Sequence, residues 1–155
     1  MTASDLVLRR AEEADLAAMV ELLALGAVPG APPRTDDDAD LGPYRAALRD
    51  IAAGDGALLV ADREGDVVGV CQLIVFRHLQ ARGELCAEIE SVHVHPDHRG
   101  GGVGTALMGA AIARARELGC SRVQLTSNVA RADAHRFYER LGFVASHVGF
   151  KMPLA

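Results

Sequence analysis

Hydrophobic and polar residues alternate along this chain with two different periods. Apolar residues at every second position predict strands, and apolar residues three or four apart predict helices. The predicted strands cover residues 6–10, 57–61, 67–76, 85–95, 122–126, 143–148 and 149–152. The predicted helices cover residues 11–24, 43–53, 105–118 and 131–141.

This order of elements predicts an α/β fold with one mixed sheet and helices on both faces. The early strands follow one another across short turns, with a hairpin at residues 62–66, so we expect them to be antiparallel. Strands joined through the long helices are expected to be parallel, by right-handed crossovers. With neither an internal repeat nor a linker, residues 1–155 are expected to form a single domain.

Composition narrows the function classes. Half of the 155 residues are hydrophobic and the net charge is −5, which favours a folded protein and argues against nucleic-acid binding. Neither a membrane span nor a signal peptide is visible, so a cytoplasmic protein is expected. Cys71, Cys86 and Cys120 have neither zinc-site nor disulfide-framework spacing and are expected to be small core residues, with no metal site.

Residues 28–40 form the least regular stretch, with three prolines and the acidic run 36–38. It could be a solvated loop that caps the next helix, or a lid whose acids attract a cationic amine.

The most distinctive motif is the glycine-rich stretch between the strand at 85–95 and the helix after it. Four glycines fall within residues 100–104, where a strand-to-helix turn can present several backbone N–H groups to a phosphate. A Walker A loop is excluded because no lysine is present there. A dinucleotide fingerprint fits poorly because Thr105 stands where the third glycine belongs.

The arrangement of Arg99, Gly102 and Gly104 after the strand resembles the acyl-coenzyme A loop of the GCN5-related N-acetyltransferases. Asn128 and residues 134–143 resemble a second signature of that family. This signature is an asparagine followed by a helix that ends in Tyr-x-x-x-Gly-Phe. The segment 125–138 is most similar to that of aminoalkylphosphonate N-acetyltransferases. The resemblance spans nearly the whole chain and implies the acyl-CoA N-acyltransferase fold, with a mostly antiparallel central sheet.

The resemblance also implies a reaction, direct transfer of an acetyl group from acetyl-CoA to the primary amine of a small molecule in a ternary complex with a general base. The family places the pantetheine arm on the strand before the turn and the pyrophosphate on the turn. The implied acetyl-CoA residues are Val92, His93, Val94, Arg99, Gly100, Gly101, Gly102, Val103, Gly104, Thr105 and Asn128. Asn128 could alternatively cap the last helix.

The family's acid, which protonates the leaving thiolate, corresponds to Tyr138. Glu88 and Glu90 are the candidate bases, with Glu88 preferred, because strand parity predicts that they share one face with Val92 and Val94. Alternatively, the acids pair with arginines such as Arg77 or Arg122. His93 and His95 have the opposite parity, and a metal shared by His93, His95 and His98 is disfavoured because the cofactor turn begins there.

The acceptor is not defined by the sequence. The acids at 36–38 would favour a polycation, whereas Arg77, His78 and Arg82 would favour an anionic tail such as a phosphonate. Acetylation of a protein amine is an alternative, and a homodimer would follow the family's habit. A non-catalytic acyl-CoA sensor would keep Arg99 and the glycines without needing Glu88, Glu90 and Tyr138.

Overall fold

In the computed structural model, which describes residues 5–26 and 40–154, five strands form one sheet in sequence order. The first four strands are antiparallel neighbours, and the last strand lies parallel to the fourth. The strands are β1 (Leu6–Arg10), β2 (Ala57–Arg63), β3 (Asp66–Arg77), β4 (Leu85–Val94) and β5 (Arg122–Gln124). The mixed sheet predicted from the sequence is confirmed, including the tight turn between β2 and β3.

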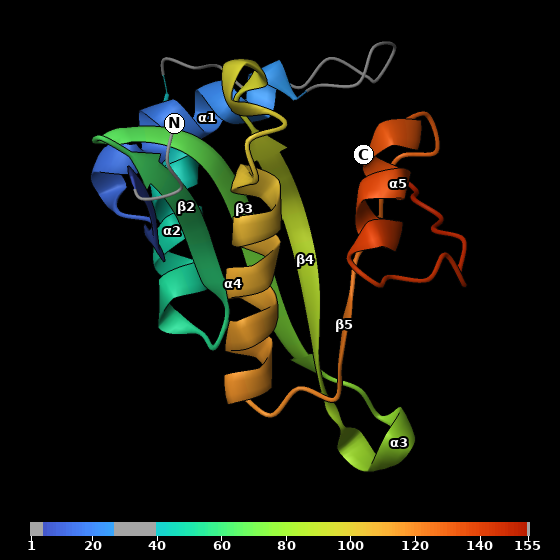
Figure 1. Ribbon diagram of the computed structural model, residues 1–155. Helices are drawn as coiled ribbons and strands as arrows, with labels where there is room; N and C mark the ends of the chain where they lie inside the picture. Colours follow the sequence, from blue (N-terminus) through green and yellow to red (C-terminus); the bar gives the residue numbers. More distant parts are fainter. Residues whose placement is uncertain (1–4, 27–39, 155) are drawn as a thin grey trace.

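Helices cover both faces of this sheet (Figure 1). Apolar residues of α1 (Leu16–Leu25) and α2 (Gly42–Ala53) pack on one face, and α4 (Val103–Glu117) packs on the other. The short α3 (Gln80–Gly83) lies between β3 and β4, and α5 (Ala132–Arg140) follows β5. Single turns of 3₁₀-helix, Glu13–Asp15 and Pro96–His98, precede α1 and follow β4. No helix of the described ranges is long and apolar enough to cross a membrane.

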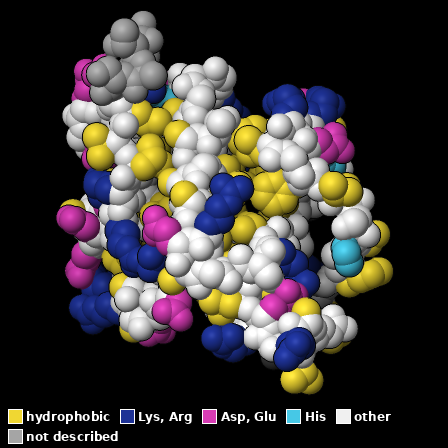
Figure 2. Space-filling view, turned by 60° about the horizontal axis from the view of Figure 1, so that its bottom comes forward, with side chains coloured by type: hydrophobic (Ala, Val, Ile, Leu, Met, Phe, Trp, Pro, Cys, Tyr) yellow, Lys and Arg dark blue, Asp and Glu magenta, His cyan; other side chains and the backbone are white. Residues whose placement is uncertain are grey.

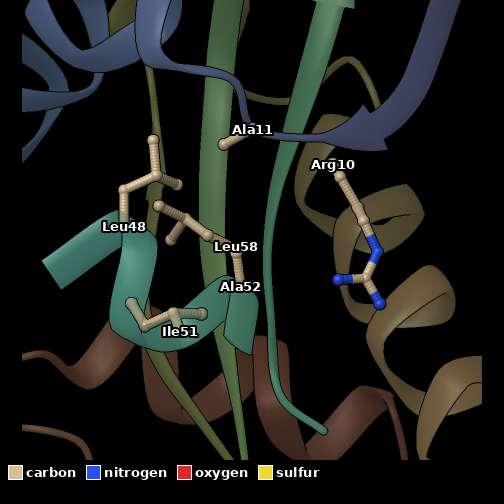
Figure 3. A pocket seen from close by; sticks show the side chains of 6 residues that line it. All are labelled: Arg10, Ala11, Leu48, Ile51, Ala52 and Leu58. Atoms are coloured by element: carbon tan, nitrogen blue, oxygen red, sulfur yellow. The ribbon is translucent and has the colours of Figure 1, made fainter. Parts of the chain in front are cut away.

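The two faces of the sheet are packed to different degrees. Under α4, the side chains of Leu73, Ile89, Leu107 and Met108 are at most 1% exposed. Under α1, Leu16, Met19 and Leu22 pack on Val60 and Val70. By contrast, α2 has no buried residue, and Leu48 and Ile51 of α2 line a pocket with Leu58 of β2 (Figure 3).

The chain after α5 departs from the expectation. Residues 143–148 and 149–152 were expected to be two strands, but they contain no strand in the structure. Alternating apolar residues favour a strand only where another strand offers a ladder, and β5 already ends at Gln124. Instead Val148, Phe150, Met152 and Leu154 are more than three-quarters exposed.

Two smaller differences concern the predicted connections. The helix predicted from residue 105 starts at Val103. Gly102 is therefore its N-cap, and Gly104 lies in its first turn. Most of the predicted irregular stretch at 28–40 lies outside the described residues.

Candidate active site

The sheet opens between β4 and β5. β5 pairs with β4 only at Cys86, Ala87 and Glu88, whereas β4 continues to Val94. Beyond this pairing the chain after β5 runs towards α5 (Figure 1). This leaves one edge of β4 without a strand partner in the described part of the chain.

The backbone of β4 shows which groups face this open edge. The N–H of His95 donates to the carbonyl of Val68 on the β3 side at 2.9 Å. Because successive residues of a strand turn their backbone groups to opposite sides, the N–H groups of Val94 and Val92 face the open edge. The Nε of Arg99 donates to the carbonyl of Val94 at 3.2 Å, which supports this direction.

A β-bulge at Ser91 changes which side chains of β4 share a face. Glu90 pairs with Gln72 and His93 with Val70, so the two residues Ser91 and Val92 stand opposite one residue of β3, and Ser91 has a left-handed φ of 52°. A bulge inserts one residue and inverts the alternation beyond it.

The prediction that Glu88, Glu90, Val92 and Val94 share one face is therefore wrong. Glu88 and Glu90 face the α1 side together with His93, while Val92 and Val94 pack into the core beneath α4. His93 lies against the end of α1, where a Cβ placed on Gly26 would come within 1.9 Å of its Nδ1. The sequence carries no glycine or proline at position 91 that would have signalled the bulge.

The two acids are held by neutral partners. Gln124 donates from Nε2 to Glu88 at 2.8 Å, and the hydroxyl of Thr126 donates to Glu90 at 3.4 Å. The arginines expected to neutralise them are engaged elsewhere, Arg122 with Glu84 and Arg77 with the carbonyl of Gly83. Burial, and then the neighbouring Glu88, raise the pKa of Glu90 above its usual value. Glu90 therefore holds a proton more tightly than an exposed glutamate does.

Tyr138 reaches the same region from α5. Its ring packs edge-on to Phe143 at a centroid distance of 6.1 Å and contacts the core under α4. Burial raises the pKa of Tyr138, and Glu90 raises it further while Arg131 lowers it. The phenol therefore keeps its proton at neutral pH, and the charge of Glu90 acts on it. Burial also raises the pKa of the Cys71 thiol to about 12, so Cys71 is a poor nucleophile.

The glycine turn forms the other end of the site. Gly100 and Gly102 have φ of 76° and 81°, and a Cβ added at either position would meet no atom within 4 Å. Gly102 is the N-cap of α4, whose first N–H groups have no partner within the helix, and the helix dipole adds positive charge there. Val103 is buried, so only its backbone can take part, whereas Thr105 is exposed. The turn can thus bind an anion.

Gly104 has a packing role as well. A Cβ at this position would lie 3.3 Å from the ring of Phe137 and 3.7 Å from Val94. This close contact ties the start of α4 to α5. Figure 2 shows hydrophobic side chains gathered between the middle part of the molecule and the part on its right.

Asn128 shapes the turn before α5. Its Oδ1 accepts from the N–H of Ala130 at 2.9 Å, and its carbonyl accepts from the N–H of Arg131 at 3.0 Å. A ring nitrogen of His135 also lies 2.9 Å from that carbonyl. The side chain of Asn128 thus has a structural role in the turn beside any role toward a ligand. Within residues 5–26 and 40–154, no three His, Cys, Asp or Glu side chains form a group suited to a metal ion.

The sequence reasoning missed several polar neighbours of this site. Gln124 and Thr126 face Glu88 and Glu90 because they share parity on the chain next to β4. That matching parity is a signal that could have found them. Lys151 was missed because residues 149–152, which carry it, were predicted to form a strand.

Comparison with known proteins gives consistent matches. The sequence profile described as "Acetyltransferase (GNAT) family" matches residues 17–143. An aminoalkylphosphonate N-acetyltransferase of Salmonella typhimurium is 38% identical over 95 residues, covering 61% of this chain and 61% of the relative. An aminoglycoside N(6′)-acetyltransferase type 1 of Stenotrophomonas maltophilia is 32% identical and covers 99% of this chain and 97% of its own length.

A solved structure also matches along nearly the full length. A Bacillus halodurans C-125 protein, described as a transcriptional regulator, is 39% identical with a TM-score of 0.88. The match covers 96% of this chain and 99% of the other.

Proposed function

Because the chain belongs to the acetyltransferase (GNAT) family, we propose that it is a single-domain enzyme that moves an acetyl group from acetyl-CoA to the primary amine of a small molecule. One observation carries this proposal. Glu90, a carboxylate with a raised pKa on the part of β4 that β5 does not pair, acts electrostatically on Tyr138, a phenol that keeps its proton. A base and an acid next to free backbone donors are what acyl transfer to an amine requires.

The donor substrate would bind along the open edge and the glycine turn. The N–H groups at Gly102 and the start of α4 suit the pyrophosphate of acetyl-CoA, and the backbone of Val92 and Val94 suits the pantetheine arm and the acetyl carbonyl. A backbone N–H aimed at that carbonyl would stabilise the negative charge that develops on its oxygen.

Glu90 would remove the proton that blocks the amine. An alkyl ammonium has a pKa of about 10.4 and carries no lone pair until it loses a proton. Glu90 is a better base than an exposed carboxylate because burial and Glu88 raise its pKa. This assignment replaces the initial preference for Glu88, whose carboxylate accepts the stronger hydrogen bond, from Gln124. The phenol of Tyr138 would protonate the departing thiolate.

The acceptor is a primary amine of a small molecule, by analogy with the aminoalkylphosphonate and aminoglycoside enzymes that this chain resembles. Those acceptors differ in charge. The competing function is that of a non-catalytic acyl-CoA sensor, because a similar protein is described as a transcriptional regulator. A sensor would not need the proposed base Glu90 and the proposed acid Tyr138.

The test is acetyl-CoA-dependent thiol release with a panel of aminophosphonates, polyamines and aminoglycosides. Gly102→Asp should weaken acetyl-CoA binding by roughly 100-fold or more, because it adds a carboxylate and a side chain at a left-handed φ beside the pyrophosphate. Gly109→Asp is the matched control, since it adds the same charge to the same helix where a Cβ meets no atom within 4 Å. Acetyl-CoA binding without turnover of any amine would favour the sensor, and equal binding by both variants would refute the site.

A further inference from the structure

The chain contains a single lysine, Lys151, on the exposed segment after α5. All fifteen other basic side chains counted with it are arginines, which are not acceptors for acetyl transfer at neutral pH. The segment around Lys151 forms neither helix nor strand. A primary amine is thus attached to a part of the chain that is not fixed in the sheet.

Two contacts and a short chain separation place this segment beside Glu90. A Cβ built on Gly149 would lie 3.7 Å from the Cγ2 of Thr126. The hydroxyl of Thr126 donates to Glu90 at 3.4 Å. Lys151 follows Gly149 by two residues, which is at most about 7 Å of extended backbone. In addition, the charge of Lys151 acts on Glu90 and lowers its pKa against the larger effects of burial and Glu88.

We propose that Lys151 is an internal acceptor that the protein acetylates in its own active site. This inference rests on the proposed function, because it uses the same donor and the same base. The amine nitrogen forms a bond to the acetyl carbonyl carbon, and the carbon–sulfur bond of acetyl-CoA breaks. The ammonium proton passes to Glu90, which releases it to solvent. The thiolate takes a proton from Tyr138 and leaves as free CoA, and the second proton that the nitrogen loses as the amide forms restores the phenol of Tyr138. The products are acetyl-lysine and CoA.

Attachment to the chain explains why one lysine would react efficiently. A tethered amine reaches effective concentrations in the millimolar range without an affinity of its own. Acetylation would also remove a positive charge from the neighbourhood of Glu90. The modified enzyme would then hold the Glu90 proton more tightly, and its activity would begin at higher pH than that of the unmodified enzyme.

The first test is peptide mass spectrometry after incubation of the full chain with isotopically labelled acetyl-CoA. The fraction of Lys151 that is acetylated should be at least ten times higher in the wild type than in Gly102→Asp. This fraction counts both acetyl groups already present from the cell and labelled acetyl groups gained in the incubation. Urea-unfolded protein incubated in the same way gives the rate of uncatalysed acetylation. Equal labelling of Lys151 in the folded chain, the unfolded chain and Gly102→Asp would overturn the proposal.

A mixing experiment separates transfer within one chain from transfer between chains. Lys151→Arg keeps the positive charge but supplies no acceptor, and Gly102→Asp keeps the lysine but loses the donor site. When the two variants are mixed, transfer within one chain predicts that neither gains label at position 151. Label on Lys151 of the Gly102→Asp chain would show transfer between molecules and contradict an internal acceptor.

The amine panel is run on the same preparation. If amines are acetylated while Lys151 carries no more acetyl than it does in Gly102→Asp, this inference fails and the proposed function stands. If the wild-type protein neither binds acetyl-CoA nor acetylates any amine, the proposed function itself fails.

Discussion

The two faces of β4 differ in how they are held. The face under α4 is apolar and closed, with Ile89 on β4 and Leu107 on α4 no more than 1% exposed. The opposite face carries Glu88 and Glu90 in half-buried positions, and α2 above this side of the sheet has no buried residue.

This difference indicates that the two faces of β4 have different roles. A close-packed interior deforms little, so the α4 face can hold the glycine turn and the backbone donors of β4 in fixed positions. On the other face, α1 is buried against the sheet, but α2 has no buried residue and can adapt to an acceptor. A second pocket, of about 110 Å³, lies between α1, α2 and the sheet and includes Gln72 and Ser91 in its lining. It lies on the face that carries the proposed base.

Removing the proposed acid gives the largest expected effect. Tyr138→Phe should lower kcat by roughly 100-fold or more, because general acid catalysis typically contributes this much. The affinity for acetyl-CoA should change little, since the ring still packs against Phe143. Steady-state kinetics together with calorimetric titration of acetyl-CoA measures both. An unchanged kcat would remove Tyr138 from the reaction.

Truncations on the two faces should differ in their cost to stability. Leu107→Ala, on the buried side of α4, should lower the free energy of unfolding by about 3 kcal/mol because it leaves a cavity in a closed core. Leu48→Ala on α2, which already lines pockets, should cost about 1 kcal/mol. Urea denaturation of both variants tests the contrast, and equal losses would show that α2 is packed as firmly as α4.

The α1 side should also be the more sensitive to acid, because an ion cluster holds the start of α1. Arg9 bridges Asp15 and Asp62 at 2.7 Å and 2.9 Å, and its hydrogen bonds lower the pKa of both carboxyls. Asp15→Asn should cost about 2 kcal/mol at pH 7, the usual range for hydrogen bonds to a charged group.

The sign of the pH dependence follows from these lowered pKa values. A carboxyl with a lowered folded-state pKa stabilises the protein above its unfolded pKa of about 4, and this stabilisation is lost as the pH falls further. The difference in melting temperature between the wild type and Asp15→Asn should therefore shrink between pH 4 and pH 2. A difference that stays constant over that range would exclude the ion cluster as its source.

Sequence patterns predicted the helices on both faces of the sheet but not the register of β4. The strands from β1 to β4 and the helix after the glycine turn follow from local periodicity, which a buried face imposes directly. The inversion at Ser91 could not be predicted, because a bulge depends on how β3 and β4 pair and not on the residue type at that position.

The end of the chain also depends on strand pairing that local sequence patterns do not reveal. The alternation of apolar residues at 148, 150, 152 and 154 is a strand pattern, but a strand also needs a partner, and β5 is only three residues long. Within the site, Tyr138 and the glycines were found through motifs of neighbouring residues. Gln124 and Thr126 were not, because their hydrogen bonds to Glu88 and Glu90 form only in the folded chain, and Lys151 was not, because its segment comes beside Thr126 only in the folded chain.

The most direct test of the account is the pH dependence of kcat/KM for the wild type, Glu90→Gln and Glu88→Gln with an amine from the panel. The wild type should lose activity on the acidic side with an apparent pKa above the usual glutamate value, and Glu90→Gln should remove this limb and lower kcat/KM by roughly 100-fold or more. Glu88→Gln should keep the limb but move it to lower pH, because the charge that raises the pKa of Glu90 is gone. An acidic limb that is unchanged in Glu90→Gln would contradict the assignment of Glu90 as the base.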